Sequence, residues 1–112
     1  MILWAAWLAC EARAPEDEEP LSTRIDAAEL ELDRAVELIR SGDPQAGAAV
    51  AQAYRQFELR LEPALRGTSP PEEVLELEYA YGQLAAAPDA LAAERVATSL
   101  SQRLDRLRSG SE

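Results

Sequence analysis

In this 112-residue chain the side chains best placed for chemistry are those of three glutamates, Glu58, Glu62 and Glu78. Glu58 and Glu78 each fall at the boundary of the apolar stripe of a predicted helix. Glu62 follows Glu58 by four residues, on the same side but further toward solvent. If the two helices are neighbours, the three carboxylates converge. Hard cations such as Fe³⁺, Ca²⁺ or Mn²⁺ accept sites built only from oxygen ligands.

The alternative for these glutamates is purely structural. Each one extends its methylene groups along the edge of the core and pairs with a nearby arginine. The arginines within reach are Arg55, Arg60 and Arg66. The spacing of the residues leaves both interpretations open.

Composition removes most other chemistry. The chain has 21 acidic and 11 basic residues, a net charge of −10, and its basic residues are all arginine. Without histidine there is no histidine acid–base catalysis, no His-ligated zinc, no Cys-x-x-Cys-His haem and no Glu-x-x-His di-iron site. Without lysine there is no Schiff base and no phosphate-binding P-loop. We therefore expect no enzyme, haem or nucleotide site, and the acidic charge excludes nucleic acid as a partner.

Cys10 ends a run of nine uncharged apolar residues, and an acidic, proline-containing linker over 11–20 follows it. Nine residues are too few to span a membrane but suit the end of a secretory signal. Small residues leading into a cysteine resemble the end of a bacterial lipoprotein signal peptide, although the basic n-region is missing and Trp7 stands where leucine is usual. The resemblance implies export to the periplasm or cell envelope, lipidation at Cys10, and membrane contact only through that anchor or the N-terminal segment. A cytoplasmic chain with an ordinary N-terminal segment is the alternative.

Four segments with helical periodicity follow the linker, and none shows the alternation of a strand. The first is predicted over 22–41 and ends at Gly42. The second is predicted over 44–66, with Asp43 as its N-cap. Pro63 lies inside this second segment, where it should kink the helix or end it early.

The third helix is predicted to begin with a capping box of Ser69 and Glu72 and to end before Pro88. The fourth is predicted over 89–108. Short connections force consecutive helices to run antiparallel, so residues 21–108 are predicted to form an all-α, antiparallel up-down four-helix bundle. The residues predicted to face its core are Leu21, Ile25, Ala28, Leu32, Ala35, Val36, Ile39, Ala46, Val50, Ala53, Tyr54, Phe57, Leu61, Ala64, Leu65, Val74, Leu77, Tyr81, Leu84, Leu91, Val96, Leu100, Leu104 and Leu107.

Residues 32–43 (LDRAVELIRSGD) resemble the helical extracytoplasmic region of bacterial high-affinity iron permease family proteins, as do 53–58 (AYRQFE), 61–66 (LEPALR) and 77–84 (LEYAYGQL). Their order is similar to that in imelysin-type periplasmic iron-uptake proteins. The resemblance implies a helical module beside an iron permease, in which the three glutamates named above contact iron. This sequence departs from the pattern because its first two glutamates stand four residues apart, where three is usual, and because these 112 residues include no permease portion.

Two functions follow from these observations. The first is a non-enzymatic, exported bundle that handles iron or another hard cation in an envelope uptake system, beside an envelope protein or iron permease. The second is a helical scaffold or adaptor. Leu30, Leu38, Leu59 and Tyr79 fall off the inward stripes and could form a surface for a protein partner or for a second copy of the chain.

Overall fold

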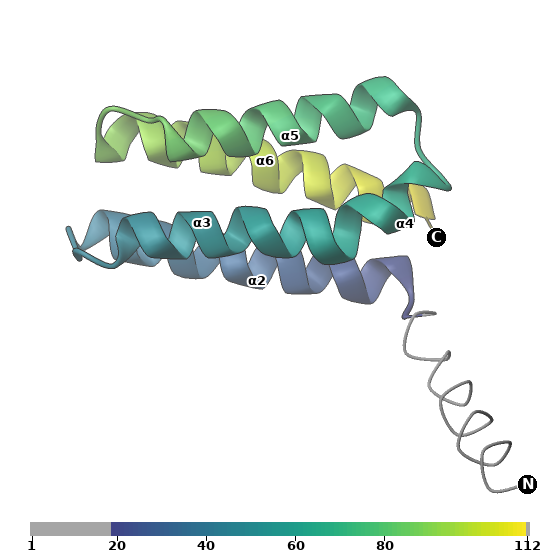
Figure 1. Ribbon diagram of the computed structural model, residues 1–112, viewed down its shortest axis with the longest axis horizontal. Helices are drawn as coiled ribbons and strands as arrows, with labels where there is room; N and C mark the ends of the chain where they lie inside the picture. Colours follow the sequence, from purple (N-terminus) through teal and green to yellow (C-terminus); the bar gives the residue numbers. More distant parts are fainter. Residues whose placement is uncertain (1–18, 112) are drawn as a thin grey trace, which may run out of the picture.

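The computed structural model describes residues 19–111, and this part of the chain contains helices and no strand (Figure 1). The helices are α2 (Leu21–Arg40), α3 (Ala46–Gln56), the π-helical turn η2 (Phe57–Leu61), α4 (Glu62–Arg66), α5 (Pro71–Ala85) and α6 (Ala90–Ser111). The segments α3, η2 and α4 follow one another without a break and act as one rod. Four antiparallel rods result, so the predicted all-α four-helix bundle is confirmed.

The four rods stand at the corners of a square. Helix α2 packs closely against α3 and α6, and α5 packs against α6 and, less extensively, against the α3–α4 rod. Figure 1 shows the two hairpins, α2 with α3 and α5 with α6, lying side by side. Helices α2 and α5 therefore occupy diagonal corners, and their outer faces point in opposite directions. None of the helices in the described range is long and apolar enough to span a membrane.

The core is built from the predicted inward stripes. Its largest wholly buried side chains are Ile25, Leu32, Phe57, Leu61, Leu65, Leu77, Tyr81, Leu100 and Leu104. Leu91 is the exception, because it is 59% exposed. Once Asp89 sets the start of α6, its inward face passes through Ala93, Ala97 and Leu100, and a residue two before Ala93 lies on the opposite side of the helix.

The turn after α2 forms as predicted, but the start of α3 does not. Gly42 has a φ of 68°. The N–H of Gly42 donates a hydrogen bond to the carbonyl of Ile39, and the N–H of Asp43 donates one to the carbonyl of Leu38. These features together make a Schellman motif. Asp43 then uses its Oδ1 to accept a hydrogen bond of 2.7 Å from the N–H of Gln45. Helix α3 consequently begins at Ala46, two residues later than predicted.

The capping box predicted before α5 is absent from the structure. Pro70 is the N-cap and Pro71 the first helical residue, and no side chain caps this end. Proline has no N–H to be capped, and its fixed φ suits the first turn. Helix α6 begins as predicted, since Oδ1 of Asp89 accepts a hydrogen bond of 2.8 Å from the N–H of Ala92, but it extends to residue 111 rather than 108.

Candidate functional site

The rod that begins with α3 contains one irregular turn, and it determines where the acidic side chains lie. In η2 the N–H of Glu62 bonds to the carbonyl of Phe57, five residues earlier, instead of four. Pro63 explains this turn, because its ring would clash with the carbonyl of Leu59 in a regular helix. The wider turn relieves the clash, and the rod runs on to Arg66. The helix therefore does not end early at Pro63, one of the two predicted outcomes, and the predicted disturbance takes the form of a π-turn just before the proline.

The π-turn directs Glu62 inward. One extra residue in a turn rotates every following side chain by about 100° relative to a continuous α-helix. Glu62 is only 8% exposed, and it is the one charged residue that is buried between residues 19 and 111. Glu58, in contrast, is exposed. The sequence prediction had placed Glu62 further toward solvent than Glu58, and the structure reverses that order.

The carboxylate of Glu62 is only half satisfied. Its Oε1 lies 3.4 Å from Nη2 of Arg66, which is longer than the roughly 2.7–2.9 Å of a charge-assisted hydrogen bond. Its Oε2 is buried and has no hydrogen-bond partner in the described part of the chain. Buried polar atoms without a partner are rare in native proteins because desolvation costs about 1–3 kcal/mol and more for a charge.

Tyr81 of α5 lies in the same region, within a layer of three aromatic rings. Its ring centroid is 5.5 Å from that of Tyr54 and 4.8 Å from that of Phe57, and both pairs are stacked. The whole residue is buried, and its hydroxyl also has no partner among residues 19–111. Burial raises the pKa of this hydroxyl above its ordinary value of 10.0. The hydroxyl is therefore protonated and neutral at physiological pH.

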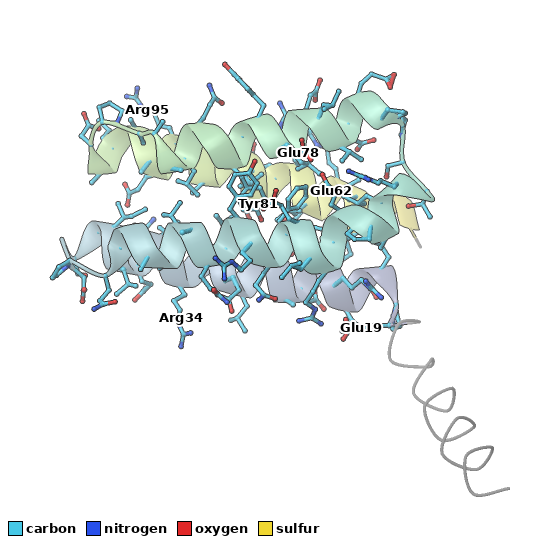
Figure 2. All side chains as sticks on the ribbon, in the orientation of Figure 1. Glu19, Arg34, Glu62, Glu78, Tyr81 and Arg95 are labelled. Carbon is cyan, nitrogen blue, oxygen red and sulfur yellow. The ribbon has the colours of Figure 1, made fainter. Side chains whose placement is uncertain are left out.

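Glu78 completes this group from α5, three residues before Tyr81. It is half-buried. Figure 2 shows Glu62 from α4, Glu78 from α5 and Tyr81 along the line where the two hairpins meet. We call this place, defined by Glu62, Glu78 and Tyr81, the α4–α5 seam. It combines two carboxylates with a neutral phenol.

The predicted metal site with three carboxylates is not found. Over residues 19–111 there is no group of three or more histidine, cysteine, aspartate or glutamate side chains that could hold a metal ion. The exposed Glu58 does not join Glu62 and Glu78, because the π-turn separates its direction from that of Glu62. The predicted lipidation site, Cys10, lies outside the described residues.

The apolar residues predicted to form an interface are not brought together. Leu30 is 71%, Leu59 65% and Tyr79 69% exposed, whereas Leu38 is half-buried. Leu30 and Tyr79 belong to the diagonal helices α2 and α5, so they cannot share one surface. Sequence reasoning missed Leu75, which is 63% exposed and lies one turn before Tyr79. The available signal was its position far from the inward stripe on the helical wheel, on the same side as Tyr79.

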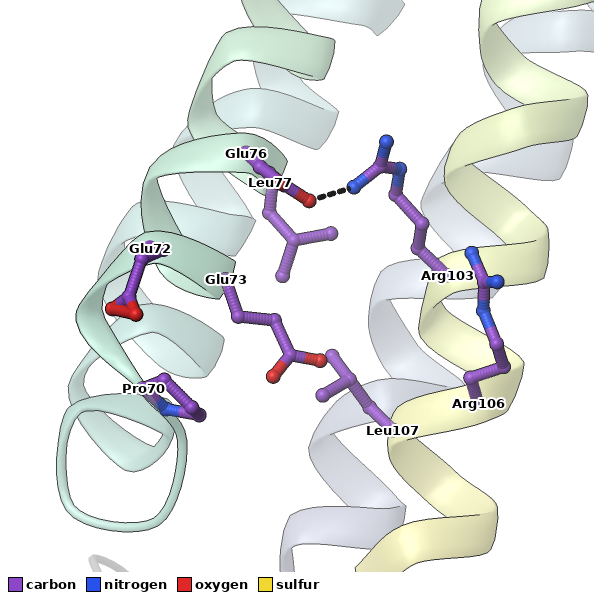
Figure 3. A pocket seen from close by; sticks show the side chains of 8 residues that line it. All are labelled: Pro70, Glu72, Glu73, Glu76, Leu77, Arg103, Arg106 and Leu107. Atoms are coloured by element: carbon purple, nitrogen blue, oxygen red, sulfur yellow. Dashed lines mark hydrogen bonds and ion pairs between the residues drawn. The ribbon is translucent and has the colours of Figure 1, made fainter.

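Glutamates flank this apolar pair. We define the α5 outer face as Glu72, Leu75, Glu76 and Tyr79, all exposed on one side of the helix. Beside it, a groove of about 570 Å³ separates α5 from α6, and Figure 3 shows Glu76 crossing it to Nη1 of Arg103 at 2.5 Å. The residues that line the groove are Pro70, Glu72, Glu73, Glu76, Leu77, Arg103, Arg106 and Leu107.

Comparison of the chain with protein families, with curated proteins and with solved structures gives no match. The functional argument therefore depends on the geometry described above.

Proposed function

We propose that this chain is a non-enzymatic docking module whose α5 outer face binds a basic amphipathic helix of a partner protein. One observation carries the proposal. Leu75 and Tyr79 are 63% and 69% exposed, one turn apart, on a helix that contains four glutamates and no basic residue. An exposed apolar pair on a helix whose own charges are all acidic is typical of an interaction surface.

The chemistry of the face defines its partner. Amphipathic helices dock through apolar anchors spaced three or four residues apart, and this spacing matches that of Leu75 and Tyr79. Tyrosine is also among the residues that contribute most at interfaces. The acidic rim selects arginine or lysine beside the anchors. A second copy of the chain fits poorly, because it would place Glu72 and Glu76 of one α5 outer face against the same residues of the other.

A binding isotherm tests the proposal. The probe is a labelled synthetic helix of about 16 residues with two leucines one turn apart, flanked by arginines. We expect the double variant Leu75→Ser/Tyr79→Ser to weaken its binding at least about tenfold, since two central anchors are lost.

The matched control is Leu30→Ser/Leu91→Ser, which removes two similarly exposed apolar side chains from the helices α2 and α6. It should change affinity less than about twofold. A peptide with glutamates in place of the arginines should not bind. Equal losses in the two double variants, or no binding to the unaltered chain, would contradict the proposal.

Cation handling through Glu58, Glu62 and Glu78 is not the function we propose. That function needs converging carboxylates, and the described residues include no group of three that could hold a metal ion. It remains a defined outcome of the metal titration given below.

We also propose that the chain is exported and tethered through Cys10, on the resemblance of residues 1–20 to the end of a lipoprotein signal peptide. Expressed in bacteria behind a basic n-region, it should yield a mature protein that begins at Cys10 and carries a diacylglycerol adduct in its intact mass. Cys10→Ala should abolish the adduct and leave an unprocessed chain. An unmodified chain of full length from the parent sequence would exclude lipidation.

A further inference from the structure

The α4–α5 seam contains buried polar atoms without hydrogen-bond partners. Oε2 of Glu62 and the hydroxyl of Tyr81 have no partner in the described part of the chain, and both residues are more than nine-tenths buried. The carboxylate of Glu78 forms no ion pair or hydrogen bond with another side chain in the range 19–111. Native proteins satisfy nearly all buried polar atoms, so the carboxylates of the seam lack a hydrogen-bond donor.

We propose that the α4–α5 seam binds a guanidinium group, an arginine side chain of the docked helix; this inference rests on the proposed function. An ionised carboxylate can only accept hydrogen bonds, and the oxygen of a neutral phenol can accept one as well. A guanidinium offers five N–H donors in a planar fork and pairs with carboxylates more selectively than an ammonium does. The half-buried ring of Tyr54, stacked on Tyr81, adds an aromatic surface that favours a planar cation.

A hard metal ion fits the same seam less well. Such ions take about six or more oxygen ligands, and no group of three acidic side chains is available within the described residues. The neutral hydroxyl of Tyr81 is a hydrogen-bonding group rather than an anionic ligand.

Access requires the movement of one exposed side chain. The side chain of Glu62 keeps 11% of its surface exposed, so it lies just beneath the surface. Arg66 covers it with a side chain that is 70% exposed, and ion pairs of this kind contribute little to stability. An incoming arginine can therefore take the place of Arg66 beside Oε1 of Glu62.

The seam also lies within reach of the docked helix. Glu78 immediately precedes Tyr79 and follows Leu75 by three residues on α5. Residues at this spacing lie within one turn of each other along the same helix. A partner arginine adjacent to the apolar anchors is thus positioned to enter the seam.

The test uses the full chain, isotope-labelled for NMR, and methylguanidinium chloride as the probe at constant ionic strength. We expect saturable shifts of the amides around Glu62, Glu78 and Tyr81, with a dissociation constant of about 1–50 mM for so small a ligand. Tetramethylammonium, which has the same charge and no N–H, should give no saturable shift. Glu62→Gln and Glu78→Gln should each weaken binding at least about fivefold, and Glu73→Gln, in the α5–α6 groove, should not.

Three results would overturn the inference. These are the absence of saturation, equal binding of tetramethylammonium, and unchanged binding in both glutamine variants. If the chain does not bind methylguanidinium, and micromolar Mn²⁺ broadens the amide signals of the seam alone, the seam would be assigned to a metal ion instead. If the basic peptide still requires Leu75 and Tyr79 while methylguanidinium fails to bind, docking stands and the guanidinium site alone is rejected. If methylguanidinium binds and peptide affinity does not depend on those two residues, the docking face is rejected.

Discussion

Replacing Tyr81 by alanine is expected to cost about 3–5 kcal/mol of unfolding free energy, because it removes a large, fully buried aromatic side chain. The side chain is wholly buried and lies in the aromatic layer with Tyr54 and Phe57. A small bundle is stabilised by only about 5–15 kcal/mol in total. Urea unfolding followed by circular dichroism should therefore show a much lower midpoint. A midpoint within measurement error of the parent chain would contradict this packing.

Tyr81→Phe is the matched control, because it keeps the ring and removes a hydroxyl that has no partner. It should leave stability unchanged or raise it by about 1 kcal/mol. A loss of more than about 1 kcal/mol would mean that the hydroxyl makes a bond that contributes to the native state.

The pH dependence of stability separates these variants further. Above pH 10 the tyrosine of the unfolded chain ionises at its ordinary pKa, whereas burial raises the pKa of Tyr81 in the folded state, which keeps its proton. The unfolded state then binds fewer protons, so this residue lowers the unfolding free energy by up to about 1.4 kcal/mol for each pH unit above 10. Tyr81→Phe should remove that slope.

Replacing Glu62 by methionine is expected to stabilise the chain by about 1–2 kcal/mol. The substitution nearly preserves volume and removes a buried, unpaired carboxylate oxygen, and the ion pair with Arg66 that it sacrifices is long and mostly exposed. Thermal unfolding should show a rise of roughly 4–8 °C for each kcal/mol in a domain of this size.

Glu58→Met is the control for this substitution. Glu58 is exposed, so its replacement should change stability by less than about 0.5 kcal/mol. If Glu62→Met were instead destabilised by more than about 1 kcal/mol, Oε2 would have a native partner that contributes to folding. Glu62→Met should lose methylguanidinium binding whichever way its stability changes.

The fold could be predicted because its main determinants are local. Apolar residues at helical spacing, the positive φ required at Gly42 and the cap at Asp89 fix the helices and their order. Short connections then leave only an antiparallel arrangement. Leu91 was misplaced because a helical wheel does not reveal where α6 begins relative to its neighbours.

The site was harder to predict because one backbone irregularity controls it. Pro63 indicates a disturbance of the helix, and the sequence predicts a kink or an early helix end there. In the structure the proline is accommodated by a π-turn that precedes it. That turn exchanges the environments of Glu58 and Glu62. Pattern analysis on a regular 100° wheel cannot reproduce such a change in register.

The docking face was only partly predicted for a different reason. Tyr79 was identified as an off-stripe residue, but it was grouped with Leu30 of α2, which lies at the diagonal corner of the bundle. Which outer faces adjoin depends on how the hairpins pack, and no single helix contains that information. Leu75 becomes part of the surface only when α5 is seen with its inward face settled against α3 and α6.

The stability variants and the binding experiments address separate parts of the molecule. Tyr81 and Glu62 concern the interior where the two hairpins meet, and Leu75 and Tyr79 concern the surface above it. We propose that the two parts act together, the apolar surface binding a partner helix and the seam binding its arginine.

The most direct test of the account is a map of the amides that respond when the isotope-labelled chain is titrated with the basic amphipathic peptide. We expect the shifted amides to lie in 71–83 of α5 and in 58–66 of the adjoining rod, with the outer face of α2 around Leu30 unaffected. The shifts should weaken as salt is raised, because the rim of the face is acidic. Shifts centred on the outer face of α2 or on α6, or spread evenly over the bundle, would contradict α5 as the docking surface.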